Sequence, residues 1–274
     1  MKWVRVNRQN KCPVCNKDSW CTYTEQVILC MRVVSQKPIT LKTGEQGWLH
    51  PVNGHVVVPQ REKDKPVPVI NVGKLMENWH GETMPNWVRD LARTLGVEWP
   101  SLAKLGCAWA PPHRAWAFPM QDGFGNFTGI RLRSDTGKKW AVPGSHQGLF
   151  FPPHQEEPLA LVCEGPTSCA AGITMGYFTV GLPSAGSGVN HLLALINRLR
   201  IQKVVLVADN KISPDNKDDI GLARMGSVGQ FVPVRYQRLT LPCKDLRDFV
   251  KLGGNKQLLG CMIDQGVWLQ KSRE

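Results

Sequence analysis

Four of the nine cysteines crowd into one short segment of the sequence. Cys12 and Cys15 form a CxxC pair, Cys21 follows after five intervening residues, and Cys30 follows after eight more. Four thiolates suit tetrahedral Zn²⁺, and the bound metal lets so short a segment fold without a large core. The β-prone runs within residues 22–29 predict a hairpin. The spacing therefore predicts a zinc site with all four cysteines as ligands. The alternative is a vestigial or three-ligand site in which Cys21 or Cys30 is only a buried thiol.

Acidic residues stand at the ends of two apolar runs later in the chain. Glu164 follows Leu-Ala-Leu-Val-Cys, Asp209 follows Val-Val-Leu-Val-Ala, and a third acidic group with Asp245 and Asp248 comes further on. Open parallel sheets bind their ligands beyond the carboxyl ends of the strands. Carboxylate oxygens that converge there suit Mg²⁺, with water and phosphate oxygens completing its shell. The pattern predicts phosphoryl transfer. The alternative is that the acids only cap helix N-termini, where the helix dipole favours negative charge.

The elements around these acids alternate between strand and helix. The apolar runs predict strands at residues 159–163, 178–181, 203–208 and 231–236, and the intervening patterns predict helices at residues 166–175, 189–199 and 220–227. Such alternation is typical of an α/β fold with a parallel sheet.

The residues before this sheet predict a second kind of architecture. Short β-prone stretches at 39–41 and 54–59 follow the cysteines, and a charged, proline-bearing linker comes next. Helix signals mark residues 85–96 and 101–105, and a β-meander is expected from residue 115. The expected organisation is a small zinc-binding β domain at 1–58, a linker at 59–70, a subdomain of helices and meander at 71–155, and the parallel-sheet domain with its tail at 156–274.

The charge balance indicates a polyanionic partner. The chain has 34 Lys and Arg against 22 Asp and Glu, a net charge of +12. Release of counterions condensed on phosphates drives such a chain towards nucleic acid. No apolar run approaches the ~18 residues of a membrane span, and the first residues lack the apolar stretch of a signal peptide, so we expect a cytoplasmic protein without a membrane partner.

Ten tryptophans are many for this length. Five of them fall in or near patterned segments and are expected to belong to the core: Trp79, Trp87, Trp99, Trp109 and Trp116.

Several short motifs resemble those of bacterial-type primases, above all the zinc-finger and toprim primases of phages and plasmids. Residues 162–171 (VCEGPTSCAA) look like the glutamate motif of the toprim fold, 207–210 (VADN) like the start of its aspartate motif, and 244–248 (KDLRD) like the trailing KDxxD of phage and plasmid proteins. Residues 118–145 are similar to the subdomain that precedes toprim in phage-type primases, and the cysteine cluster is similar to their zinc-binding domain. The motifs occur in the order expected of a primase and cover most of the chain.

This resemblance implies a primase-like nucleotidyltransferase that makes short primers on single-stranded DNA by two-metal phosphoryl transfer, in the replication of a mobile element. Glu164 and Asp209 would be catalytic, and Mg²⁺ or Mn²⁺ would be held by Glu164, Asp209, Asp245 and Asp248. Nucleoside triphosphates and nucleic acid would be bound by Arg131, Arg133, Lys138, Lys139 and Lys211. The sequence has no GxxxxGK[ST] phosphate loop, so a helicase would be a separate partner.

Lys211 departs from the family pattern, which usually has Asp-x-Asp at residues 209–211. An ammonium group cannot ligate Mg²⁺, so either an acid from residues 212–219 replaces the missing ligand or the metal site is weakened. In the second case the chain would be a catalytically silent zinc and toprim adaptor that binds single-stranded DNA in replication. A toprim nuclease would share the acids but leave the zinc module without a role.

Overall fold

The computed structural model describes residues 3–41, 46–52, 69–153, 158–184, 186–210 and 220–270. The chain forms two compact units, which divide between Val67 and Pro68. The strand expected at residues 54–59 and most of the linker expected at 59–70 lie outside the described residues. None of the helices in the described ranges is long and apolar enough to cross a membrane.

The first unit is a five-stranded antiparallel sheet with the order β1-β2-β3-β5-β4. Its strands are β1 (Val4–Arg5), β2 (Thr22–Tyr23), β3 (Val27–Cys30), β4 (Pro38–Thr40) and β5 (Gln46–Pro51). The predicted hairpin is confirmed, with Thr22 opposite Leu29 and Tyr23 opposite Ile28. The sequence pattern did not predict β5, which pairs with both β3 and β4. The small core of this sheet contains Val6, Tyr23 and Ile28 together with three of the clustered cysteines.

The second unit begins with three helices, α1 (Val72–Glu82), α2 (Pro85–Leu95) and α3 (Trp99–Lys104). The pattern predicted α2 and α3 but not α1. Proline stands in the first turn of α2, where its missing N–H costs nothing, and Gly96 ends the helix with a φ of 70°. Next comes a four-stranded antiparallel sheet with β6 (Ala108–Ala110), a 3₁₀ turn (Pro111–His113), β7 (Ala115–Gln121), β8 (Phe127–Arg133) and β9 (Lys139–Ala141). The predicted β-meander is therefore confirmed.

The rest of the second unit is the predicted α/β part. Its parallel sheet has the order β11-β10-β12-β13. The strands are β10 (Leu159–Glu164), β11 (Phe178–Leu182), β12 (Lys203–Ala208) and β13 (Arg235–Thr240), and the helices are α4 (Gly165–Thr174), α5 (Val189–Leu199), α6 (Ile220–Gly229), α7 (Leu246–Lys251) and α8 (Lys256–Asp264).

The prediction of the last strand at residues 231–236 was wrong by about four positions, since β13 spans Arg235–Thr240. The apolar run that suggested the earlier position closes a turn after α6, where the N–H of Val232 donates to the carbonyl of Gly229. Pro233 has no N–H to donate to a neighbouring strand. β13 lies at the edge of the sheet, where Arg235 and Arg238 are both exposed, and these arginines disguise the strand in the sequence.

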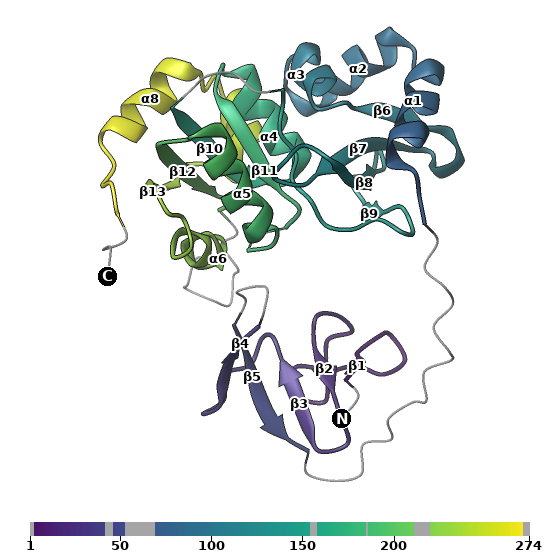
Figure 1. The fold of residues 1–274 in the computed structure, drawn as a ribbon, viewed down its shortest axis with the longest axis vertical. Coiled ribbons are helices and arrows are strands. Elements are labelled where there is room, and N and C mark those ends of the chain that lie inside the picture. Colours follow the sequence, from purple (N-terminus) through teal and green to yellow (C-terminus); the bar gives the residue numbers. More distant parts are fainter. Residues whose placement is uncertain are drawn as a thin grey trace. The chain divides into compact units, whose positions relative to one another are not determined.

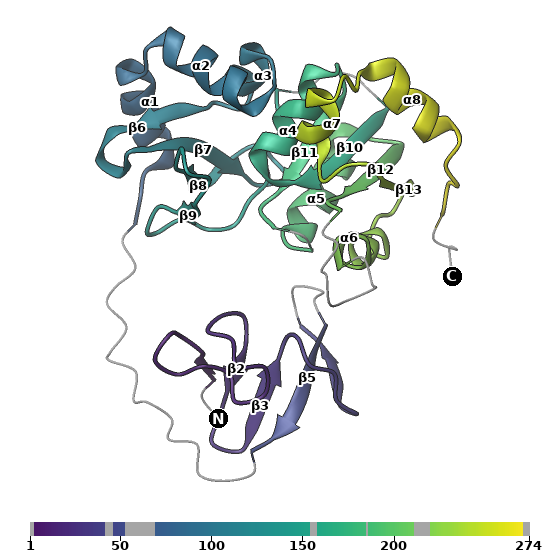
Figure 2. The ribbon, with the colours of Figure 1, turned by 180° about the vertical axis from the view of Figure 1, so that it is seen from behind.

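Each face of the parallel sheet buries its own layer of helices. Alternate residues of β10 point to opposite faces, so Leu161 packs in one core and Val162 in the other. The first core also takes apolar residues from α2, α3, α4, α7 and α8, and the second takes them from α5 and α6. Figures 1 and 2 show α4 and α5 on either side of the sheet. Because helices cover both faces of the sheet, the ends of its strands are the part that remains for a functional site.

A short segment after β9 joins the antiparallel sheet to the parallel one. Leu149 pairs with Gln121 at the end of β7, and Phe150 exchanges two backbone hydrogen bonds with Gly181 of β11. Both Leu149 and Phe150 are almost completely buried. The two sheets of the second unit are therefore coupled through backbone hydrogen bonds and core packing.

The expectation that five tryptophans belong to the core was wrong for two of them. Trp79 and Trp116 are buried, but Trp87 and Trp99 are 41% and 47% exposed. Trp109 is half-buried. The exposed rings lie at the start of amphipathic helices α2 and α3, where sequence periodicity does not separate the edge of an apolar face from its centre.

Candidate metal centre and active site

The four clustered cysteines form a compact group in the first unit. The Sγ atoms of Cys12, Cys15, Cys21 and Cys30 all lie within 4.8 Å of one another. Two of the Sγ pairs are 3.6 Å (Cys15 and Cys21) and 3.9 Å (Cys21 and Cys30) apart. Thiolates bound at ~2.3 Å to a tetrahedral zinc lie about 3.8 Å apart, so the donor set and its spacing fit Zn²⁺. All four cysteines are positioned together, which argues against the three-ligand alternative.

Hydrogen-bond donors surround these sulfur atoms. The backbone N–H of Met31 donates to Cys21 Sγ at 3.4 Å, and that of Val33 donates to Cys30 Sγ at 3.3 Å. The guanidinium of Arg32 lies 3.6 Å from Cys21 Sγ and donates to the carbonyl of Ser19 at 2.7 Å. Burial raises the pKa of Cys21 to about 12. A cation is therefore needed for all four thiols to ionise, and the donors around them orient the thiolates that result.

The parallel sheet brings the two predicted catalytic acids to the same edge, the one formed by the carboxyl ends of its strands. Glu164 is the last residue of β10, where it lies opposite Leu182 of β11. On the other side of β10, Val162 lies opposite Leu206 of β12, so Asp209, which follows the last residue of β12, reaches the edge at the same level. The edge is the carboxyl end of the strands, as the sequence predicted.

The turn after Glu164 depends on a glycine. Gly165 has a φ of 79°, a left-handed conformation that residues with a Cβ rarely adopt, and it begins α4 at once. The neighbouring strand comes very close, because a Cβ on Gly181 would lie 2.6 Å from the carbonyl oxygen of Gly165. This sharp strand-to-helix turn leaves Glu164 at the carboxyl end of β10, directly before α4.

Asp245, which was expected to be a metal ligand, caps a helix and pairs with an arginine. It is the N-cap of α7, where Oδ1 accepts from the backbone N–H groups of Arg247 and Asp248 at 2.9 and 3.0 Å. Its Oδ2 accepts from the Arg247 guanidinium at 2.8 Å. These bonds use three of the roughly four lone-pair positions of a carboxylate, so at most one remains for a metal. Burial by itself would raise the pKa of Asp245, but the bonds from Arg247 and from the two N–H groups together lower it.

Electrostatic interactions show that the acids share one neighbourhood. The buried thiol of Cys163 has a raised pKa, first because of burial, then because of Cys169, and then because Asp209, Asp245 and Glu164 all place negative charge near it. The segments that carry Asp209 and Asp245 are tied directly, since the N–H of Asn210 donates to the carbonyl of Lys244 at 2.7 Å. Among the described residues, however, only the four cysteines form a group of three or more ligand side chains within 4.8 Å. Mg²⁺ usually takes one or two carboxylates and completes its shell with water and phosphate, so this looser arrangement fits it.

Three of the predicted basic residues face these acids. Arg133 and Lys139 lie directly opposite each other in β8 and β9, and Arg131 shares their face of the sheet two positions along. Arg131 also donates to the carbonyl of Pro183 at 2.9 Å. Burial lowers the pKa of Arg131, and the nearby charge of Glu164 acts in the opposite direction.

The charges on Arg133 and Lys139 act against each other. Lys139 is exposed, but the surrounding protein removes part of its hydration and lowers its pKa, and the charge of Arg133 lowers it further. Burial and the nearby charge of Arg247 lower the pKa of Arg133 in the same way. Like charges directly opposite each other in a sheet are destabilising, so this arrangement favours an anion between them.

Two other predicted binding residues stand apart from this group. Lys138 points to the other face of the sheet, and its ammonium lies 5.6 Å from the centroid of the Trp140 ring. Lys211 and the acids of residues 212–219 lie outside the described residues. The described site therefore does not include the residue that departs from the Asp-x-Asp pattern.

Sequence reasoning missed Arg247 as a member of this site. Besides its bond to Asp245, its Nε–H is buried and has no hydrogen-bond partner among the described residues. A buried donor of this kind marks a place where a ligand can complete the bonding. The signal was present in KDLRD, because an arginine two residues after an N-capping aspartate lies within reach of its carboxylate.

Comparison with solved structures identifies the fold. The structure is similar to the zinc-binding and RNA polymerase domains of the Aquifex aeolicus primase, with a TM-score of 0.58, 15% identity, and coverage of 94% of this chain and 78% of that one. It is also similar to the primase fragment of the bacteriophage T7 primase-helicase protein, with a TM-score of 0.51, 14% identity, and coverage of 96% and 100%. A DnaG primase catalytic domain bound to single-stranded DNA matches with a TM-score of 0.54 at 16% identity, covering 72% and 79%.

The chain has the fold of bacterial-type primases. The resemblance predicted from the motifs is thus confirmed at the level of the fold, with a four-cysteine zinc-binding unit and a primase-like core that contains a parallel toprim-type sheet. No family description and no curated protein matches the sequence. The primase-like fold places Glu164 and Asp209 at the edge of its parallel sheet, next to the basic face of β8 and β9.

Proposed function

We propose that this protein is a DNA primase, a nucleotidyltransferase that makes short primers from nucleoside triphosphates on single-stranded DNA. The observation that carries the proposal is the meeting of Glu164 and Asp209 with the basic face of Arg131, Arg133 and Lys139. Carboxylates beside a face of positive charge are what transfer of a nucleotidyl group needs, since substrate, template and product are all polyanions.

In this proposal Glu164 and Asp209 would hold Mg²⁺ or Mn²⁺, and two such ions would supply the Lewis-acid polarisation of the attacking 3′-hydroxyl and the α-phosphate. Arg131 and Lys139 neutralise the phosphates of the incoming nucleotide. Arg133 and Arg247 bind the neighbouring phosphates of the nucleic-acid strand. Asp245 positions Arg247 and caps α7, and thereby sets the place of Asp248.

The zinc-binding unit and the replication context complete the proposal. Zn²⁺ bound by the four cysteines stabilises the first unit, as in the zinc-binding primase that the chain resembles in fold. We assign the protein to the replication of a phage, plasmid or other mobile element, with a separate helicase as its partner.

Primer synthesis on a single-stranded template tests the proposal. Glu164→Gln and Asp209→Asn each remove one carboxylate charge with little change in volume, and we expect either change to lower primer yield about 100-fold or more. Single-stranded DNA affinity and thermal stability should stay close to those of the wild type. Asp264→Asn, an exposed acid at the end of α8, is the matched control and should be fully active.

Near-normal primer yield from either active-site variant would overturn the assignment. A wild-type protein that binds single-stranded DNA but makes no primer with either metal would instead support the adaptor function.

A further inference from the structure

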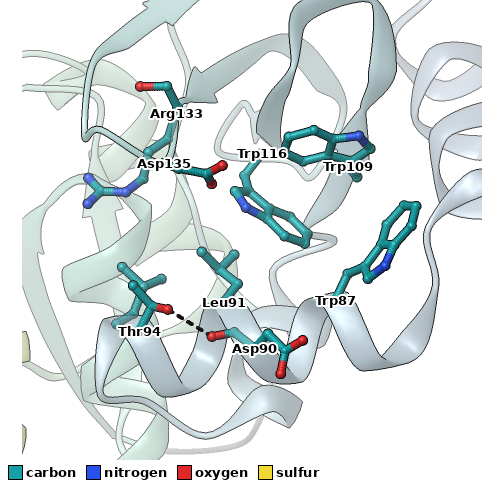
Figure 3. A pocket seen from close by; sticks show the side chains of 10 residues that line it. Trp87, Asp90, Leu91, Thr94, Trp109, Trp116, Arg133 and Asp135 are labelled. Atoms are coloured by element: carbon teal, nitrogen blue, oxygen red, sulfur yellow. Dashed lines mark hydrogen bonds between the residues drawn. The ribbon is translucent and has the colours of Figure 1, made fainter.

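A pocket lined by three tryptophans lies between α2 and the antiparallel sheet of the second unit (Figure 3). Its volume is about 430 Å³, which is within the ~300–1,000 Å³ range of small-molecule sites. Trp87, Leu91 and Leu95 come from α2, Trp109 from β6, and Trp116 from β7. The proposed primase chemistry gives this pocket no role.

The three rings have different degrees of exposure. Trp116 is buried, and its ring centroid lies 5.3 Å from that of Trp109 at an interplanar angle of 69°. Edge-to-face packing of this kind fixes the Trp109 ring while leaving it partly uncovered. Trp87 is 41% exposed on the side of α2 that faces the pocket. The pocket therefore offers fixed aromatic surface that a flat ligand can stack on.

The polar groups around the pocket exclude some ligands. Asp90 and Asp135 lie among its lining residues, and the Asp135 carboxylate points towards the side of Trp116 (Figure 3). Asp90 is paired with Arg93 on the exposed surface of α2. Two carboxylates repel a phosphate or an acidic peptide, but they can accept hydrogen bonds from the amino groups of a nucleobase.

Arg133 connects the pocket to the candidate active site. It is a lining residue, but its guanidinium points away from the tryptophans (Figure 3). On that side it lies close enough to Asp245 and Arg247 for their charges to act on its pKa. A polyanion that runs along Arg133 thus passes directly beside the mouth of the pocket.

We propose that this pocket binds an unpaired nucleobase of the single-stranded template, stacked on Trp87 and Trp109, while Arg133 holds the neighbouring phosphate. The inference deepens the proposed function, and it rests on that function for the identity of the strand as template. Aromatic rings beside a basic groove are the usual way to hold a single strand, because every base has a face that stacks.

Fluorescence anisotropy with a labelled single-stranded oligonucleotide and the full-length protein tests this directly. We expect Trp87→Ala to weaken binding about 5- to 150-fold, the range for loss of one base–aromatic stack. Trp87→Phe should keep most of the affinity, whereas Trp87→Leu, which is apolar but has no ring, should lose it. Thermal unfolding of all three variants checks that they remain folded.

Two controls separate stacking from other causes. On the same oligonucleotide with abasic sugars, the backbone charge is kept but no base can stack, so Trp87→Ala should match the wild type. Trp99→Ala removes a ring of similar exposure that does not line the pocket, and it should bind like the wild type. Equal losses for Trp87→Ala and Trp87→Phe, or a loss that persists on the abasic strand, would overturn the inference.

The outcome is independent of catalysis. Normal primer synthesis with unchanged binding by Trp87→Ala would refute the pocket inference and leave the proposed function standing. If the wild type makes no primer but Trp87→Ala still binds single-stranded DNA more weakly than the wild type does, the proposed function is refuted. The pocket then remains a site for nucleobases. Full affinity of Trp87→Leu for the oligonucleotide would show that no ring is needed and would contradict stacking of a nucleobase.

Discussion

The zinc centre and the acidic edge of the parallel sheet are built in opposite ways. In the first unit, four ligands from residues 12–30 come within 4.8 Å of one another around a hairpin. In the second unit, Glu164 ends β10, Asp209 follows β12 and Asp245 caps α7, and the described carboxylates do not gather so tightly. One site is closed by its own ligands, and the other is an open edge faced by basic residues. On the proposed function, the first site stabilises a fold, whereas the second takes metal and phosphate as its ligands.

The largest expected effect is loss of the zinc centre. Cys12→Ser combined with Cys15→Ser removes half of the ligands, and structural zinc contributes about 10–16 kcal/mol to the folding of such small units. We expect zinc to be absent from the variant by elemental analysis and the first unit to be unfolded, while the second unit keeps its thermal transition.

Cys261→Ser is the control for this experiment, because that thiol is exposed and lies in α8, far along the chain from the cluster. It should keep one zinc per chain. Full zinc content in the double variant would contradict the four-thiolate site.

A smaller effect is expected at Asp245, whose cap and ion pair hold the acidic edge together. Asp245→Ala should destabilise the second unit by about 2–4 kcal/mol, since loss of an N-cap costs ~1 kcal/mol and a partly buried arginine is left without its partner. Asp245→Asn keeps the cap bonds but loses the charge, so its loss should be intermediate. Denaturant unfolding measures both, and equal stability of Asp245→Ala and the wild type would rule out the structural role.

The same ion pair predicts a dependence on pH. The pKa of Asp245 is lowered in the folded protein, so its contribution is complete above the unfolded value of about 3.9 and is lost as the pH falls through the folded value. Below that range Asp245→Asn and the wild type should converge in stability. A difference that stays constant down to strongly acidic pH would show that charge is not its origin.

The smallest effect concerns the basic face. Lys139→Ala removes one positive charge that faces Glu164 and Asp209. The slope of log K against log salt for single-stranded DNA binding should therefore become less steep by about 0.7. Lys138→Ala is a matched control, because Lys138 precedes β9 and lies over the Trp140 ring, and it should change the slope less. An equal change for both lysines would mean that the basic face does not bind the strand more than other lysines of the surface do.

The sequence predicted what is encoded locally. The CxxC spacing, the hairpin and the apolar runs that end at Glu164 and Asp209 are all short-range patterns, and the structure has each of them in place. β13 was placed about four residues too early because two exposed arginines interrupt the apolar pattern of this edge strand, and α1 was missed altogether.

Long-range packing accounts for the rest. The like charges of Arg133 and Lys139 and the tryptophan pocket both depend on how separate elements meet. Periodicity assigned Trp87 to the core because it shares a helix with Leu91 and Leu95, yet it lies at the rim of that apolar face.

Primer synthesis by the wild-type protein is the most direct test of the central claim that this fold carries a working active site. Purified zinc-loaded protein is mixed with a single-stranded DNA template, nucleoside triphosphates and either Mg²⁺ or Mn²⁺, and the products are resolved on a gel. We expect short template-dependent oligonucleotides that disappear when a chelator removes the added divalent metal. The absence of any product with either metal, while single-stranded DNA is still bound, would contradict that claim.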